Sequence, residues 1–275
     1  MNHKVEMTTL IDNVASEPLA AEWGLSVLIT VDGRKILLDT GSGQLFAQNA
    51  LLLGIDLTEV DAGVLSHAHY DHADGLDTFF AANNKAPFLL REGSCENCYA
   101  IKNGALEYIG IRKGLLKDYE DRIQYVSGVH AIADGVWLIP HRKAEYASIA
   151  RRNDLYTICN GVRTPDDFAH EQSLVIETEK GLIAFNSCSH TGLKNILGDI
   201  SAMLGRCDVY AYVGGLHLYK LADDELAELC EEIKQSSIEH IFTGHCTGDH
   251  AFSVLKSQLG ERVERFYTGF SYRFD

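Results

Sequence analysis

The stretch of sequence that decides the fold is residues 62–72, AGVLSHAHYDH. Its apolar first half is typical of a buried parallel strand. Its second half brings four candidate metal ligands into six residues: His67, His69, Asp71 and His72. Residues two apart point to the same side of an extended segment, so the first two histidines share one position. The aspartate and the third histidine then face a second position in the turn into the next helix. Because core packing does not explain such a cluster, the stretch predicts two adjacent metal sites.

Strands and helices alternate on both sides of this stretch. We expect a β-hairpin over 25–40, where Asp32-Gly33 supplies the positive φ angles of a tight turn. A second hairpin is expected over 173–187, with its turn at Glu179-Lys180-Gly181. Alternating helices and strands follow each hairpin, which predicts sheets covered by helices. We therefore expect an α/β fold in which two mixed sheets, flanked by helices, pack face to face as an αββα sandwich.

Three further histidines follow predicted strands in the second half of the chain: His190 after 182–187, His217 after 209–213 and His245 after 240–243. In α/β sheets, ligands bind at the carboxyl ends of the strands. Taken alone, each of these residues is equally well explained as a histidine that caps a helix or is partly exposed. At the same sheet edge as the first cluster, metal ligation becomes the better interpretation for His190 and His245. For His217, a ligand, a general acid, a substrate contact and a structural role all stay open.

Other polar residues near this edge receive weaker assignments. Asp39 ends the first hairpin, and we expect its carboxylate to accept hydrogen bonds from the histidine loop rather than to bind metal. Cys188 also lies at the edge, but a buried inert thiol fits it equally well. His170 precedes a strand instead of following one, so it is left out of the site. The pair Cys95 and Cys98 lacks the second half of a structural zinc site and has no assigned role.

Composition limits the class of protein. The 275 residues are 46% apolar and 23% charged, as in ordinary globular chains, and no apolar run approaches the roughly 18 residues that span a bilayer. The net charge of −15 disfavours nucleic acid and anionic membranes as partners. Seven scattered cysteines and no recognisable export signal predict a cytoplasmic protein with free thiols. The oligomeric state is open, a homodimer being one option.

We expect a single domain over 1–275, with an insertion or cap at about 91–169, where periodicity is weak. Four basic residues of that segment are candidates to hold a phosphate or carboxylate: Arg142, Lys143, Arg151 and Arg152. Solvated surface charge explains them at least as well, so both interpretations stay open. The sequence does not decide whether the segment covers the site as a lid.

These motifs resemble those of the metallo-β-lactamase superfamily. The resemblance rests on Asp39 in LLDTG, on the H-x-H-x-D-H run at 67–72 and on His245 in TGHCTG. More narrowly, EKGLIAFNSCSHTG at 179–192, VGGLHL at 213–218 and TGHCTG at 243–248 are similar to the subgroup of dihydropterin synthase-like metallo-hydrolases. The resemblance extends from about residue 20 to residue 270 and is weakest over 91–169.

The resemblance implies an αββα metallo-β-lactamase-like sandwich that holds two divalent metal ions, zinc in the first place and manganese or iron as alternatives. It places one ion on His67, His69 and His190, and the other on Asp71, His72 and His245. The superfamily usually has a bridging Asp, or in one branch a Cys, after a late strand. The corresponding strand of this chain offers Cys188 and His190 and no Asp, so the occupancy of the second position is open.

We therefore expect a binuclear metallo-hydrolase that uses a metal-activated water on a small anionic ester, lactone or phosphoester. Asp71 and His217 are the candidate catalytic residues, the histidine as the group that protonates the leaving group. The alternative is a metal-dependent transferase that joins a dihydropterin to an aminobenzene ribosyl phosphate, as the resemblance suggests. A di-iron oxidoreductase ranks lower, because its relatives carry more carboxylate ligands and a flavin-binding domain.

Overall fold

Two seven-stranded sheets form the centre of the molecule, which is described here by a computed structural model covering residues 3–141, 143 and 146–274. The first sheet has the order β18-β1-β2-β3-β4-β5-β8. Its strands are β1 (Val5–Ile11), β2 (Ser26–Val31), β3 (Arg34–Leu38), β4 (Ala62–Val64), β5 (Phe88–Arg91), β8 (Ile123–Val126) and β18 (Ser271–Phe274). Neighbouring strands from β18 to β3 are antiparallel and those from β3 to β8 are parallel, so the sheet is mixed.

The second sheet has the order β17-β16-β15-β14-β13-β10-β9 and repeats the same plan. Its strands are β9 (His130–Ala133), β10 (Val136–Pro140), β13 (Gln172–Thr178), β14 (Gly181–Phe185), β15 (Val209–Val213), β16 (His240–Thr243) and β17 (Val263–Arg265). The strands from β9 to β14 are antiparallel neighbours, and those from β14 to β17 are parallel. Both predicted hairpins are present, the first through left-handed Asp32 and Gly33 with φ of 49° and 89°.

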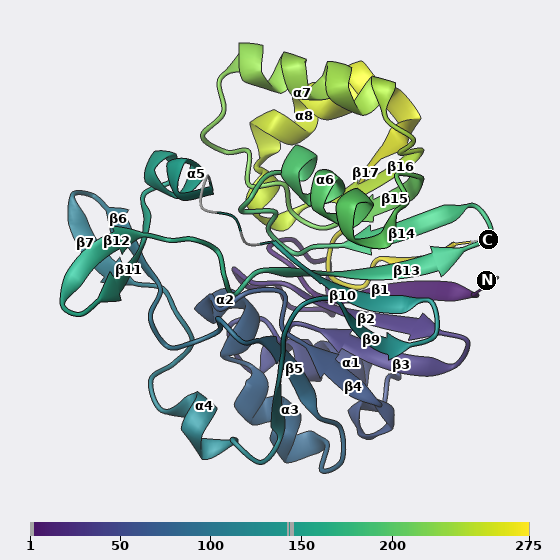
Figure 1. Cartoon of the computed structure of the whole chain (residues 1–275). Helices are drawn as coiled ribbons and strands as arrows, with labels where there is room; N and C mark the ends of the chain where they lie inside the picture. Colours follow the sequence, from purple (N-terminus) through teal and green to yellow (C-terminus); the bar gives the residue numbers. More distant parts are fainter. Residues whose placement is uncertain (1–2, 142, 144–145, 275) are drawn as a thin grey trace.

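Helices cover the outer face of each sheet (Figure 1). The helices of the described chain are α1 (Leu45–Leu52), α2 (Tyr70–Ala73), α3 (Leu76–Ala82), α4 (Leu115–Asp118), α5 (Ala147–Arg152), α6 (Leu193–Leu204), α7 (Asp223–Gln235) and α8 (Asp249–Leu259), with 3₁₀ turns η1 (Leu57–Glu59), η3 (His245–Thr247) and η4 (Gly260–Arg262). In Figure 1, α6, α7 and α8 lie over the second sheet, whereas α1 and α3 lie over the first. This is the predicted αββα sandwich.

Three apolar layers hold these elements together. Because successive side chains of a strand point to opposite faces of the sheet, neighbouring residues of one strand belong to different layers. Ile36 and Leu38 of β3 face the layer between the sheets, whereas Leu37 faces the layer under α1 and α3. In β13, Leu174 joins the layer between the sheets and Val175 joins the layer under α6, α7 and α8. Because each sheet is buried on both faces, polar side chains gather where the strands end. No helix in the described part of the chain is both long and apolar enough to cross a membrane.

A third, four-stranded sheet stands at one end of the sandwich, away from the two termini (Figure 1). Its order is β12-β11-β6-β7, from β6 (Tyr99–Lys102), β7 (Ala105–Tyr108), β11 (Leu155–Cys159) and β12 (Val162–Pro165). All four strands come from the segment 91–169, but the same segment also supplies β8, β9 and β10 to the two large sheets. The division of the chain into one domain with an insertion at 91–169 stays a prediction.

Candidate metal centre

The strand ends bring three histidines to one position. His67 and His69 follow β4, and His190 follows β14. Each offers a ring nitrogen, and these three nitrogens lie within 4.8 Å of one another. The centroids of the three rings are separated by 4.6 to 4.8 Å, and all three side chains are buried. We refer to this group as the first position. It is the set that the resemblance assigns to one metal ion.

A second position lies beside the first. Asp71 and His72 occupy the first turn of α2, and His245 follows β16. Oδ2 of Asp71 lies 3.7 Å from Nε2 of His72 and 3.5 Å from Nε2 of His245. The rings of His72 and His67 are 4.1 Å apart, so the two positions adjoin. The structure therefore brings all six predicted metal ligands together in two groups of three, while their ligation of metal stays a prediction.

The donor atoms of both positions fit divalent cations. Nε2 of His67 and His69 and both ring nitrogens of His190 are buried, and none has a hydrogen-bond partner among the described residues, whereas Nε2 of His245 faces Oδ2 of Asp71 at 3.5 Å. A buried polar atom without a partner is costly, and native proteins rarely leave several in one place. Imidazole nitrogens with one carboxylate oxygen form a ligand set that suits zinc, manganese or iron. A divalent ion bound here would give these nitrogens a partner.

Hydrogen bonds at the far side of three rings point Nε2 into the centre. The Ser66 hydroxyl lies 2.6 Å from Oδ2 of Asp39 and donates to it, so its oxygen accepts from Nδ1 of His67 at 2.8 Å. Nδ1 of His72 lies 2.8 Å from Oδ2 of Asp39, and Nδ1 of His245 lies 3.1 Å from Oδ1 of Asn13. Because Nδ1 of each ring is held by an acceptor, Nε2 is the ring atom that faces the metal positions.

Asp39 holds the histidine loop, as the sequence predicted. It is fully buried, and its carboxylate accepts from the backbone N–H of Ser66 at 2.7 Å as well as from the Ser66 hydroxyl and His72. Its backbone is left-handed, with φ of 61°. Ser189, His217 and His245 have φ of 51°, 51° and 47° at the same rim. Non-glycine residues rarely adopt this conformation, and such strain concentrates at functional sites.

Sequence reasoning missed other residues that support the site. Glu171 is buried, and its Oε1 accepts from the backbone N–H of His190 at 2.7 Å. Its Oε2 accepts from the backbone N–H and the hydroxyl of Thr191 at 3.1 and 2.7 Å. At the second position, Oδ1 of Asp12 accepts from the backbone N–H of His245 at 3.1 Å. No local pattern marks either carboxylate, because each precedes or ends a strand far from the histidine that it holds.

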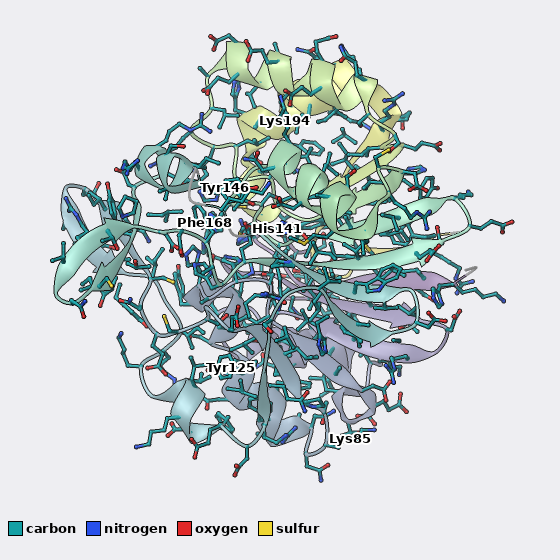
Figure 2. The ribbon with its side chains drawn as sticks, in the orientation of Figure 1. Lys85, Tyr125, His141, Tyr146, Phe168 and Lys194 are labelled. Carbon is teal, nitrogen blue, oxygen red and sulfur yellow. The ribbon has the colours of Figure 1, made fainter. Side chains whose placement is uncertain are left out.

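His170, which the sequence analysis left out, also contacts the histidine loop. Its Nδ1 accepts from the backbone N–H of Ala68 at 3.1 Å, which leaves the proton on Nε2 for Oδ2 of Asp166 at 3.1 Å. Cys98 Sγ lies 3.7 Å from the same Nε2. Phe168, labelled in Figure 2, stacks on His190 with ring centroids 5.7 Å apart and planes inclined by 9°. The segment before β13 thus supports both His69 and His190 from the side of the third sheet.

Burial and mutual proximity keep the first position uncharged. Burial, with the neighbouring histidines, holds the pKa of His67 and of His190 well below the usual range. Burial lowers the pKa of His69 to about 3. Burial opposes charge at the second position too, but His72 and His245 hold the pKa of Asp71 low, and Asp71 with Cys246 raises the pKa of His245 to about 9. The first position therefore offers neutral imidazoles, and the second an ion pair.

His217 lies at the first position but has no hydrogen-bond partner there. Its ring centroid is 4.3 Å from that of His190, and neither of its nitrogens is hydrogen-bonded within the described chain. It is half-buried and lines a cavity of about 500 Å³. The same cavity is lined by His69, Asp71, His190 and His245. His217 therefore faces the space in which a substrate would meet the metal positions.

The mouth of the cavity is built by the third sheet and by exposed aromatic residues. Lys102 comes from β6, Lys220 lies between β15 and α7, and Trp23 and Tyr219 are about half exposed. Asn153 is buried beside them, and its Oδ1 has no partner among the residues described. The cavity thus combines aromatic walls with two amino groups and a free acceptor.

Two of the four basic residues at 142–152 form ion pairs away from the metal positions. Arg142 lies outside the described residues. The Lys143 amino group lies 2.6 Å from Oδ1 of Asp199, and Nη1 of Arg152 lies 2.7 Å from Oε1 of Glu225. None of the described members of this group lines the cavity beside the metal positions. Lys102 and Lys220, which the sequence analysis did not single out, occupy that place.

Sequence comparison agrees with this geometry. The family model of the metallo-β-lactamase superfamily matches residues 24–147. A protein of Methanocaldococcus jannaschii, named 7,8-dihydropterin-6-methyl-4-(β-D-ribofuranosyl)-aminobenzene-5'-phosphate synthase, is 28% identical to this chain over 283 residues. The alignment covers 96% of this chain and 95% of that relative.

Solved structures share the architecture. Tm1679, a metal-dependent hydrolase of the β-lactamase superfamily, has a TM-score of 0.82 and 29% identity, with 98% of each chain covered. The metallo-β-lactamase fold protein YhfI from Bacillus subtilis has a TM-score of 0.60 at 12% identity, with 98% of this chain and 100% of that chain covered. This fold implies binding of divalent metal and suggests a metal-dependent enzyme. These similarities support a place for the chain in the metallo-β-lactamase superfamily and, within it, in the subgroup of dihydropterin synthase-like metallo-hydrolases.

Proposed function

We propose that this protein is a binuclear metallo-hydrolase that cleaves a small anionic ester, lactone or phosphoester. The observation that carries the proposal is the pair of adjoining three-residue groups, four of whose six residues line one cavity. His67, His69 and His190 would hold one divalent ion, zinc in the first place. Asp71, His72 and His245 would hold the other. When bound, such ions polarise a carbonyl or phosphoryl oxygen and lower the pKa of a coordinated water towards neutrality.

The protein's own residues supply orientation. Because the Ser66, Asp39 and Asn13 side chains hold Nδ1 of three histidines, the Nε2 atoms of these rings are aimed at the metal positions before any ligand arrives. Burial keeps the first position neutral, so its nitrogens need not lose protons to bind a cation. Because these groups are already oriented, no free energy is spent on reorganising them during the reaction.

Charge at the site supports an anionic substrate despite the net charge of −15. The proposed ligand set contains one carboxylate, that of Asp71, so it offsets little of the charge of two divalent ions. Lys102 and Lys220 add positive charge at the cavity mouth, although Lys220 also contacts Asp154 at 3.0 Å. The unpartnered Oδ1 of Asn153 would accept a hydrogen bond from a hydroxyl or amino group of the substrate.

His217 is the proposed general acid. It lines the cavity, and both of its ring nitrogens are available to hold a proton. A leaving group that points away from the metal positions would meet this ring, which would donate the proton that the departing oxygen needs. Asp71, as the carboxylate of the second position, is the other candidate catalytic residue.

The test begins with protein purified under reducing, anaerobic conditions and analysed for metal content. We then expect the metal-loaded protein to hydrolyse at least one substrate from a panel of phosphoesters, lactones and carboxylic esters, and to lose this activity when a chelator removes the metal. His217→Ala is expected to keep the metal and lose turnover. His250→Ala is the matched control, because His250 is an exposed residue of α8 paired with Asp223. Folded protein that takes up no metal would contradict the proposal.

The synthase named for the Methanocaldococcus jannaschii relative is the second candidate function. It would use the same metal positions, so the ligands do not separate the two reactions. Metal-loaded protein that hydrolyses nothing in the panel, yet joins an activated dihydropterin methyl group to an aminobenzene ribosyl phosphate, would establish the synthase instead. A cytoplasmic location, the absence of nucleic acid and membrane partners, and the oligomeric state stay predictions from the sequence.

A further inference from the structure

A buried chain of hydrogen bonds runs from α6 to the loop that carries His190, and none of the roles assigned so far involves it. Its members are Asp199, His141, Ser173, Asn186 and Ser189, all of them buried. Nδ1 of His141 lies 3.1 Å from Oδ2 of Asp199, and Nε2 of the same ring lies 2.7 Å from Oγ of Ser173. Nδ2 of Asn186 donates to Ser173 Oγ at 3.0 Å, and its Oδ1 accepts from the backbone N–H of Ser189 at 2.7 Å.

The donors and acceptors of this chain match in one direction. An ionised carboxylate only accepts hydrogen bonds, so Nδ1 of His141 donates to Asp199. The Ser173 oxygen accepts from Asn186, which leaves the hydroxyl proton for Nε2 of His141. A doubly protonated ring would instead leave this proton without an acceptor in the described part of the chain. Each link from the Ser189 amide to the Asp199 carboxylate is thus paired, and such links strengthen one another.

The Asp199 end of the chain is fixed by two more groups. The Tyr146 hydroxyl donates to Oδ2 of Asp199 at 3.0 Å, and the Lys143 amino group lies 2.6 Å from Oδ1. His141 and Tyr146, labelled in Figure 2, both lie between β10 and α5. The carboxylate is therefore held in place as the final acceptor of the chain.

The Ser189 end joins two loops that face the cavity. Ser189 is left-handed, with φ of 51°, so its conformation depends on the groups that hold it. Its hydroxyl lies 2.7 Å from the Tyr212 hydroxyl and donates to the carbonyl oxygen of Gly215 at 2.6 Å. Gly215 stands two residues before His217, and Ser189 directly precedes His190. One residue therefore directs the backbone at a proposed metal ligand and at the proposed general acid.

His190 depends on its backbone more than the other histidines of the centre do. Three of those histidines have a hydrogen bond on Nδ1 that orients the ring. Both ring nitrogens of His190 lack a partner among the residues that the structure describes. Its ring is oriented by Phe168, which stacks on it, and by its backbone, which Glu171 holds from one side. The chain that ends at Ser189 holds the backbone on the other side of His190.

We propose that Asp199, His141, Ser173 and Asn186 are positioning residues, which act through Ser189 to fix His190 at the first metal position. The proposal rests on the metal centre of the proposed function. None of the four residues lines the cavity. Loss of one link would leave a buried donor and a buried acceptor unpaired, and it would release Ser189 from the conformation that directs His190.

Ser173→Ala removes the middle link and tests the proposal without reference to activity. We expect zinc at the first position to bind roughly tenfold more weakly, as after loss of other supporting contacts, and zinc at the second position to bind unchanged. Competition with a chromophoric chelator measures both affinities in metal-free protein. In cadmium NMR of protein loaded with two ions, only the resonance of the first position should shift, and His245→Ala identifies the resonance of the second.

Ser187→Ala is the matched control. Ser187 is a buried serine of the same loop after β14 and is nearer to His190 along the chain. Its hydroxyl has no partner within the described chain, so it is not a link. Both zinc affinities and both cadmium resonances should stay as in the unmodified protein.

A double variant separates a connected chain from two unrelated packing defects. Asn186→Ala breaks the next link, and the combination of Ser173→Ala with Asn186→Ala breaks both. Because the links of one chain fail together, the double variant should lose no more zinc affinity than the more affected single variant. Losses that multiply in the double variant would overturn the proposal.

The outcomes separate this proposal from the proposed function. Unchanged zinc binding by Ser173→Ala, or equal weakening at both positions, would overturn the positioning role and leave the metal centre intact. Unmodified protein that binds neither zinc nor cadmium would overturn the proposed function itself. If Ser173→Ala does not fold, Ser173→Cys takes its place, since a thiol is a weaker donor and acceptor than a hydroxyl. A smaller loss confined to the first position then supports the proposal, and an unchanged first position refutes it.

Discussion

Replacing Asp39 by asparagine should weaken metal binding without altering any metal ligand. The carboxylate accepts three hydrogen bonds, two from Ser66 and one from Nδ1 of His72. In Asp39→Asn, the remaining oxygen can still accept from the Ser66 backbone, but the amide NH₂ faces the donor on His72. A hydrogen bond to a charged group contributes about 1.5–3 kcal/mol, and here a buried N–H is left without an acceptor.

Part of that loss should appear as lower metal affinity, because the freed His72 ring no longer holds Nε2 towards the second position. Loss of such a supporting contact reduces metal affinity roughly 10- to 100-fold. At about 1.4 kcal/mol per tenfold change, this equals roughly 1.4–2.8 kcal/mol, which agrees with the hydrogen-bond value. We therefore expect the second ion to dissociate at least tenfold more readily, and the first ion to be less affected.

The assay is competition for zinc or cobalt with a chromophoric chelator, combined with thermal unfolding in the presence and absence of metal. Asp56→Asn is the control. Its exposed carboxylate accepts from the backbone N–H of Thr58 at 2.9 Å and caps η1 instead of holding the histidine loop, so metal affinity should not change. The reasoning is refuted if folded Asp39→Asn retains both ions with the affinity of the unmodified protein.

Two further predictions concern carboxylates that the sequence did not single out. Glu171→Gln should weaken the first position by roughly tenfold, because one of the oxygens that accept from the backbone of His190 and Thr191 becomes an NH₂ group. Metal stoichiometry under limiting chelator checks this, and loss of the second ion alone would contradict it. Burial opposes ionisation of Asp199, but contacts with His141, Lys143 and Tyr146 hold its pKa below the usual value. His141 and Tyr146 are labelled in Figure 2. Since the folded-state pKa is lowered, this carboxylate stabilises the fold above a pH of about 4 and ceases to do so as the pH falls through the folded-state pKa. Asp199→Asn should therefore melt at a lower temperature than the unmodified protein at pH 7, and the difference should shrink towards pH 3. A constant difference across that range would refute the assignment.

Local sequence was sufficient for much of the fold. The turn at Asp32-Gly33 and the short apolar run before His67 each depend on neighbours within a few residues, so their patterns predicted the first hairpin and β4. The segment 91–169 was harder to predict. Strands such as β7 (Ala105–Tyr108) are largely exposed, and their residues show no apolar alternation that would mark a strand. Pairing with β6 decides their conformation.

The sequence by itself determined which side chains can hold metal, because ligand type and the spacing of His67, His69, Asp71 and His72 are local properties. Tertiary structure decided the orientation of those side chains and which other residues contact them. Asp12 contacts His245 across 233 positions of sequence, and Cys188 contacts His72 across 116. Such contacts arise because two sheets, built from strands far apart in the sequence, pack with their strand ends along one rim. A hydrogen bond depends on distances of a few tenths of an ångström, and packing alone sets these distances.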